Sequence, residues 1–238
     1  MLPTLPLRDN IESRTYPGVT ILLIVTNVVV FLWQVLLPRG ADQEFMAAFA
    51  LIPARLFDLG SYTHFGVVPT LCPLVTHMFL HGGWLHVGFN MLFLWIFGDN
   101  VEDLLGHFRF LVFYFVCGLC AVLTFIVSSP GSGVPLVGAS GAIAGVLGAY
   151  FLSFPKSTIE TLIPLFGFIP VRIPIPSVIF LGLWFFLQLK YGMLLAGASG
   201  GGVAWWAHIG GFVAGMLLLK PFKPKQRVVM HRPKSPRT

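Results

Sequence analysis

The fold of this chain is decided at residues 138–145, which read Gly138-Ala139-Ser140-Gly141-Ala142-Ile143-Ala144-Gly145. A helix-breaking loop, SSPGSGVP at residues 128–135, comes just before it, so we expect a helix to begin at Ser140. A serine in the first turn has its hydroxyl beside free backbone N–H groups and the positive end of the helix dipole. This setting suits a nucleophile whose product is an oxyanion, and the same small residues suit a packing seam between helices.

The composition around this stretch describes a membrane protein. The 238 residues include only 10% charged side chains, and the mean hydropathy is +0.84. Apolar runs of eighteen or more residues with few charges are typical of transmembrane helices. We therefore predict an all-α, polytopic bundle with six spans, at residues 19–37, 84–97, 108–127, 140–154, 177–195 and 203–219.

Charge sets the expected topology. Basic residues gather in the first seventeen residues, in the connections after the second and fourth spans and at the C-terminus, so by the positive-inside rule both termini are cytoplasmic, as in a bacterial inner membrane. We expect a cytoplasmic segment at 1–17, a membrane domain at 18–220 and a basic cytoplasmic tail at 221–238. The tail is either a solvated anchor or lies on anionic lipid. The N-terminus lacks a signal-peptide pattern, so the first span is expected to be retained.

Short spans predict a cavity. A helix over 140–154 covers only about 22 Å of a hydrocarbon core that is about 30 Å thick, and the second span is expected to be similarly short. The loop before Ser140 must then lie at membrane depth, where irregular backbone is tolerated only beside protein or a water-filled cavity. We expect that cavity to open on the outer face, with Ser140 at its floor. Residues 155–176, rich in proline, are expected to be a cytoplasmic connection.

Polar side chains at membrane depth are costly and mark functional sites. Here they are His77, His81, His86, His208 and Asn90. His86 and Asn90 are four residues apart, so both lie on one face of the second span. Glycines at 210, 211 and 215 follow His208 and let another helix approach closely.

These residues assemble into a hydrolytic site. Ser140 is the expected nucleophile and His208 its general base. His86 and Asn90 are expected to join the Ser140 backbone N–H as oxyanion donors. The acidic residues at 99, 102 and 103 lie more than about 10 Å from Asn90 along the helix, so we predict a dyad without an acidic third member.

Other interpretations stay open for the same residues. The Gly-Ala-Ser-Gly run also fits a packing seam, and a lone membrane histidine also fits a bond between helices. His77 and His81 have metal-ligand spacing, but no carboxylate or cysteine completes the set. Cys117 and Cys120 form C-x-x-C in an apolar helix and are interpreted as packing residues. We expect no metal, no other cofactor and no nucleic-acid partner.

At these residues the chain resembles the rhomboid family of intramembrane serine proteases, over roughly residues 19 to 219. The motifs that carry the resemblance are HGGWLHVGFN at 81–90, FGDNVED at 97–103, GASG at 138–141 and AHIGGFVAG at 207–215. The resemblance implies a six-helix core in which the Ser140–His208 dyad cleaves peptide bonds in or near transmembrane segments of membrane proteins. It also implies that His86 and Asn90 are oxyanion donors and that Phe89 and Trp184 face each other at a lateral gate.

Two positions depart from the family's pattern. Members often carry Trp-Arg in the first outer loop, where this chain has Cys72-Pro73. Some members have a tyrosine four residues after the serine that stacks on the catalytic histidine, and here that residue is Ala144. The group that orients His208 is therefore open. The alternative function is a catalytically silent relative that binds transmembrane helices, and a transporter is disfavoured because paired broken helices are missing.

Overall fold

The computed structural model describes residues 5–38, 40–165, 169–194 and 204–224. All six predicted apolar segments are helical in it. They are α1 (Gly18–Leu36), α7 (Trp84–Leu105), α8 (His107–Ser128), α9 (Ser140–Ser153), α10 (Ser177–Leu194) and α11 (Trp205–Phe222). Within these ranges α1, α8 and α10 are long and apolar enough to cross a membrane, whereas α9 is a shorter apolar helix. The expected span limits at 195 and 203, and most of the basic tail, lie outside the described residues.

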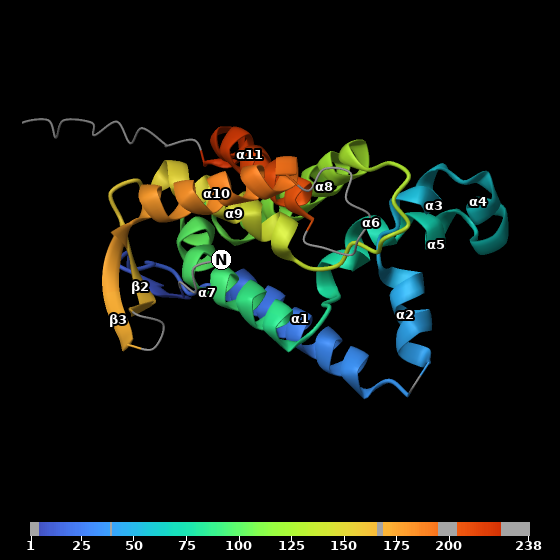
Figure 1. The fold of residues 1–238 in the computed structure, drawn as a ribbon. Helices are drawn as coiled ribbons and strands as arrows, with labels where there is room; N and C mark the ends of the chain where they lie inside the picture. The colour runs from blue at the N-terminus through green and yellow to red at the C-terminus, as the bar shows by residue number, and fades with distance from the viewer. Residues whose placement is uncertain (1–4, 39, 166–168, 195–203, 225–238) are drawn as a thin grey trace, which may run out of the picture.

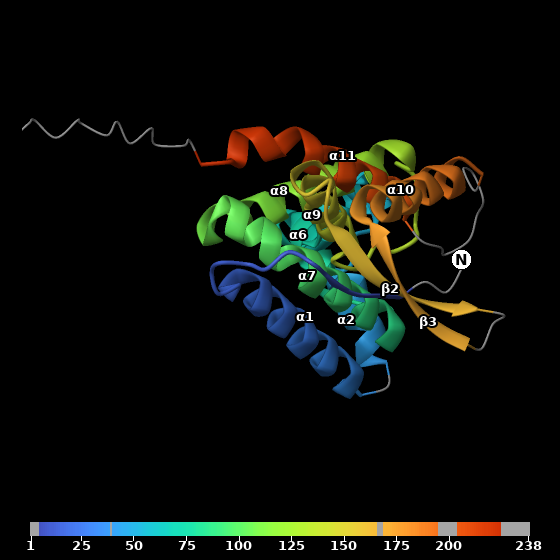
Figure 2. The same cartoon turned by 90° about the vertical axis from the view of Figure 1, so that its left-hand side faces the viewer.

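Helix α9 is the centre of the bundle and contacts α7, α8, α10 and α11. Helices α1 and α11 lie on opposite sides of the bundle in both views (Figures 1 and 2). The packing between α9 and α11 is backbone against backbone: a Cβ atom on Gly215 would overlap the carbonyl oxygen of Gly145, and one on Gly211 would overlap that of Gly141. The expected close approach at these glycines is confirmed, because small residues let two helices touch along their main chains.

Helix α7 continues beyond Phe97, where the predicted second span ends. It has 22 residues and ends at Leu105, before Gly106 with φ 81°. Polar residues at 99 and 100 stay helical because the N-terminal segment supplies partners: Ser13 donates to Asp99 at 3.1 Å and Asn100 donates to Asp9 at 3.0 Å. Of the two spans expected to be short, only α9 is short.

The prediction of an all-α chain is wrong at one end of the bundle. Strands β1 (Leu5–Asp9), β2 (Thr158–Leu165) and β3 (Ile169–Pro176) form an antiparallel sheet in the order β1-β2-β3, visible in Figure 1. The expected connection over residues 155–176 therefore contains two paired strands. Prolines argue against a strand in the sequence, but β3 is at the sheet edge, where proline is tolerated.

The sheet joins the N-terminal segment to the helical bundle. Tyr150, near the end of α9, donates a hydrogen bond to the carboxylate of Asp9 at the end of β1 and lies 3.0 Å from the Ser157 hydroxyl. Burial raises the pKa of Asp9 to about 6. Residues 5–17, which belong to the expected cytoplasmic segment, therefore contact the end of α9 through Asp9 and the end of α7 through Ser13 and Thr15.

The segment between α1 and α7 forms short helices. They are α2 (Ala41–Phe49), α3 (Pro53–Phe57), α4 (Leu59–Phe65), α5 (Val67–Leu71), α6 (Pro73–Thr76) and the 3-10 turn η1 (His77–Phe79). Helices α3, α4 and α5 lie at the end of the molecule away from the sheet (Figure 1). This segment is hydrogen bonded to the loop before Ser140.

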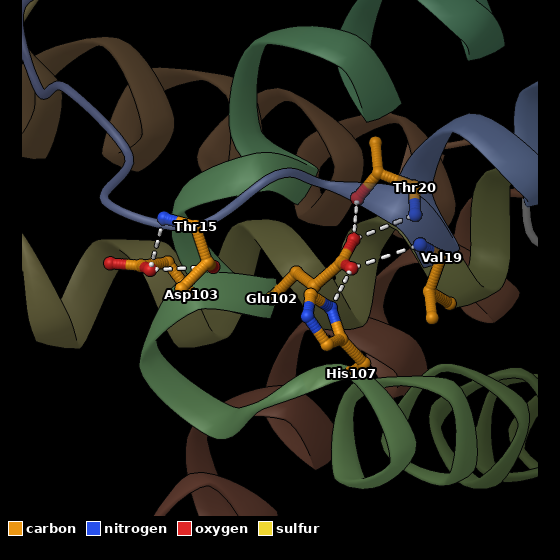
Figure 3. Close-up of polar contacts among 6 residues, drawn as sticks. All are labelled: Thr15, Val19, Thr20, Glu102, Asp103 and His107. Atoms are coloured by element: carbon orange, nitrogen blue, oxygen red, sulfur yellow. Dashed lines mark hydrogen bonds and ion pairs between the residues drawn. The ribbon is translucent and has the colours of Figure 1, made fainter.

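Glu102, near the end of α7, accepts hydrogen bonds from the free backbone N–H groups at the start of α1 (Figure 3). The N-cap position of α1 is Pro17, whose side chain cannot cap the helix. Glu102 accepts hydrogen bonds from the backbone N–H groups of Val19 and Thr20 at 2.9 and 2.7 Å, and from the Thr20 hydroxyl at 2.7 Å. His107 contacts the same carboxylate at 2.6 Å, and Glu102 is wholly buried. A buried carboxylate thus takes the place of a capping side chain.

Changing Glu102 to Gln is expected to lower the free energy of unfolding by about 2–3 kcal/mol, because an amide NH2 would face N–H and O–H donors in a buried site. Thermal unfolding in detergent measures the effect. The matched control is Asp103→Asn: Asp103 accepts from the Thr15 backbone N–H and hydroxyl at an exposed position, so its loss is expected to stay below about 1 kcal/mol. Equal shifts for the two variants would contradict the capping role of Glu102.

Candidate active site

The loop before α9 is held by the segment between α1 and α7. Leu136 and Leu51 exchange two backbone hydrogen bonds, at 2.7 and 3.1 Å, and the Gly138 N–H donates to the His77 carbonyl at 2.9 Å. Gly138 has φ 113°, a left-handed conformation that favours glycine. A Cβ atom there would also lie 2.8 Å from the His86 ring. The loop therefore turns into α9 with Ser140 as the first helical residue, as the sequence predicted.

Ser140 and His208 meet across the seam between α9 and α11. The Ser140 Oγ lies 2.7 Å from the His208 Nε2, although the two residues are 68 positions apart. His208 is in the first turn of α11 and is 9% exposed. Such a distance is that of a direct hydrogen bond, so the imidazole can accept the serine proton.

The other nitrogen of His208 contacts a residue that the sequence analysis missed. The Gln188 Oε1 on α10 lies 2.7 Å from the His208 Nδ1, and Gln188 is only 2% exposed. The ring centroids of Trp184 and Trp205 lie 6.0 and 6.4 Å from the centroid of the imidazole. Gln188 could have been found, because a polar side chain in an apolar span marks a functional position just as the histidines do.

His86 and Asn90 of α7 lie beside Gly138, on one face of their helix. The Gly82 N–H donates to the His86 Nδ1 at 3.3 Å, so a neutral His86 carries its proton on Nε2. A Cβ atom on Gly138 would lie 2.8 Å from that Nε2 and 3.6 Å from the Asn90 Nδ2. Asn90 is buried, and its Nδ2 makes no hydrogen bond within the described part of the chain. Two N–H donors therefore lie next to the backbone that leads to Ser140.

All six sequence-predicted site residues line one cavity of about 640 Å³. They are Ser140, His208, His86, Asn90, Phe89 and Trp184. The remaining lining is mostly apolar and comes from α7, α8, α9, the loop before α9 and the N-cap of α11. Phe89 is 48% exposed, while the Trp184 ring packs against Phe212 as well as His208.

The two other histidines have different neighbours. His77 in η1 has its Nδ1 2.9 Å from the Pro73 carbonyl. His81 is buried, with its ring edge-on to Phe31 and His86. The pair that was considered as metal ligands is thus divided between separate contacts, and the described residues hold no group of three or more metal-ligating side chains.

These features define a helical membrane protein in which a serine and a histidine are hydrogen bonded inside a cavity among apolar helices. Comparison with known families is consistent with this class. A family model described as "Rhomboid domain" matches residues 69–224. The chain belongs to the rhomboid family.

Named relatives include proteases at modest identity. The chain is 33% identical to "Rhomboid protease GluP" of Bacillus subtilis over 56% of its own length and 24% of the relative. It is 39% identical to "Putative rhomboid protease YdcA" of the same organism over 32% of its length and 38% of the relative. It is 29% identical to human "Presenilin-associated rhomboid-like protein, mitochondrial" over 66% of its length and 37% of the relative. The chain thus spans about a quarter to two fifths of the length of these relatives.

Proposed function

We propose that this chain is an intramembrane serine endopeptidase that cleaves membrane proteins in or near their transmembrane segments. The observation that carries the proposal is the 2.7 Å contact between the Ser140 Oγ and the His208 Nε2 in a cavity among apolar helices. Membership of a family with named serine proteases supports the same conclusion.

The reaction follows from the two side chains. Ser140 attacks the scissile carbonyl carbon as its proton passes to the His208 Nε2, and a tetrahedral intermediate forms. His208 then gives that proton to the leaving amine, the C–N bond breaks and an acyl-enzyme remains. A water molecule, deprotonated by His208, hydrolyses the ester and releases Ser140. His208 is thus base and acid in turn.

The oxyanion is the second requirement of this chemistry. His86, Asn90 and the backbone N–H of Ser140 are the proposed donors, since His86 Nε2 and Asn90 Nδ2 lie near Gly138, two residues before the nucleophile. The helices and the loop fix these N–H donors in place before the reaction begins. Donors that need no rearrangement stabilise the negative charge that develops on the oxyanion most effectively.

Substrate entry is proposed to occur beside α10. Only four residues of this helix are buried, namely Ser177, Leu181, Gln188 and Gly192, so it is held more loosely than α9. Phe89 and Trp184, on α7 and α10, line the cavity on this side and are the proposed gate. A substrate helix must unwind locally to present its peptide bond, because helical backbone shields the carbonyl carbon.

The topology is part of the proposal. Six crossings would place both termini in the cytoplasm, with the membrane domain over 18–220, the sheet on the cytoplasmic side and the cavity open to the outer face. Three helices of sufficient length, and the basic residues in the first seventeen positions and at the C-terminus, support it.

A serine-directed fluorophosphonate probe tests the nucleophile. We expect the wild type to be labelled, Ser140→Ala not to be labelled, and His208→Ala to react about 100-fold more slowly, because the hydroxyl loses its base. Ser153→Ala is the matched control, since Ser153 is at the other end of the same helix, and its labelling is expected to equal that of the wild type. A folded wild type that resists the probe would favour the silent alternative.

A further inference from the structure

We propose that Gln188 is a positioning residue for His208, the neutral third member of the site. This inference rests on the proposed function and deepens it. The evidence is the 2.7 Å contact between the Gln188 Oε1 and the His208 Nδ1, which lies on the opposite edge of the imidazole from the contact with Ser140.

The contact is built into the packing of the bundle. Gln188 is 2% exposed although it is a polar residue in an apolar helix. Burying a carboxamide is costly unless it is hydrogen bonded, and the described structure gives its Oε1 one side-chain partner, His208. This pairing removes part of the cost of burial and fixes the relative position of α10 and α11 at the site.

The hydrogen bond selects one tautomer of the imidazole. An amide oxygen accepts but does not donate, so the Nδ1 of neutral His208 must carry the proton. The lone pair is then on Nε2, where Ser140 donates. The opposite tautomer would place an N–H against the serine hydroxyl and could not remove its proton. A carboxylate orients the histidine in other serine hydrolases, and here an uncharged acceptor is placed to do so.

The remaining contacts of the ring do not select a tautomer. Trp184 and Trp205 bound the imidazole, and Tyr191 of α10 stacks on Trp205, with Lys190 beside it. Ala144, where some family members carry a stacking tyrosine, is wholly buried. The titratable side chains that line the cavity are His86 of α7 and His208 itself. Among the described neighbours of the imidazole, Gln188 is therefore the residue that places the proton on Nδ1.

The first arm of the test compares Gln188→Met with the wild type on a fluorogenic membrane substrate in detergent. Methionine preserves the length of the side chain and lacks the acceptor. We expect kcat to fall about 10- to 100-fold with KM little changed, since only base catalysis is impaired. Phe186→Met, on the exposed face of the same helix, is the matched control and is expected to keep the wild-type rate. Thermal unfolding of each variant separates misfolding from loss of rate.

The second arm is Gln188→Glu, which retains an acceptor. We expect kcat to recover toward the wild-type value, and the acidic limb of the kcat/KM profile to move up by about one pH unit or more, because a carboxylate stabilises the imidazolium. A purely structural role would not move this limb. If Gln188→Met cleaves with the wild-type rate, or Gln188→Glu leaves the limb unmoved, Gln188 does not position His208. An inactive wild type would instead overturn the proposed protease function.

Discussion

Replacing Ser140 by alanine is expected to reduce cleavage of a co-expressed single-span membrane protein by about 1000-fold or more, because the hydroxyl that forms the acyl-enzyme is lost. His208→Ala is expected to cost about as much, since the Ser140 hydroxyl is a weak nucleophile without the base 2.7 Å away. The fraction of substrate converted to product, measured by quantitative immunoblot, reports both effects.

The double variant distinguishes a joint mechanism from two separate contributions. Residues that act as one unit are strongly non-additive, so Ser140→Ala/His208→Ala is expected to be no worse than either single variant. Ser153→Ala, which alters the opposite end of α9, should retain wild-type cleavage. Persistence of cleavage in either single variant would refute the assignment of the dyad.

Changing Gly215 to alanine is expected to lower the free energy of unfolding by about 2 kcal/mol or more and to reduce cleavage about 100-fold. The added Cβ atom would overlap the carbonyl oxygen of Gly145, and a backbone atom cannot rotate away as a side chain can. Helices α9 and α11 must therefore separate, which moves Ser140 away from His208. Displacement of reacting groups by about 1 Å can cost about 100-fold in rate.

Thermal unfolding and cleavage, measured on one detergent preparation, check both parts of this prediction. Gly88→Ala is the control for stability: Gly88 is in the second turn of α7, and a Cβ atom there meets nothing within 4 Å. Alanine is the better helix former by about 1 kcal/mol, so this variant should be at least as stable as the wild type. A Gly215→Ala protein with unchanged stability would show that the seam can widen freely.

Helices and motif residues could be predicted because their signals are local. Five of the six expected segments begin within one residue of the observed helix, and the sixth begins two residues before it. The start at Ser140 is reproduced, since a loop of glycine, proline and serine precedes it. The small residues along α9 and α11 likewise predicted that these two helices pack closely. The same local signals singled out the residues that line the cavity.

Long-range pairing could not be predicted in the same way. Strand β1 pairs with β2 about 150 residues later, and β3 carries prolines that argue against a strand unless its place at the edge is known. The polar end of α7 was interpreted as lying beyond the span, because its partners Asp9 and Ser13 are distant in sequence. Gln188 stands out in the sequence as a polar residue in an apolar span, but only the packing of α10 against α11 shows that its amide oxygen meets His208.

The sequence by itself determined that this is a helical membrane protein of the rhomboid type with a serine at the start of a short helix. Hydropathy, the glycine pattern and motif spacing are properties of short stretches of sequence, so they can be recognised without the tertiary structure. Only the tertiary structure decided which groups touch: the 2.7 Å contact of Ser140 with His208 and that of His208 with Gln188. Hydrogen bonds depend on distances of tenths of an ångström between separate helices, and backbone packing at the glycine seam sets those distances.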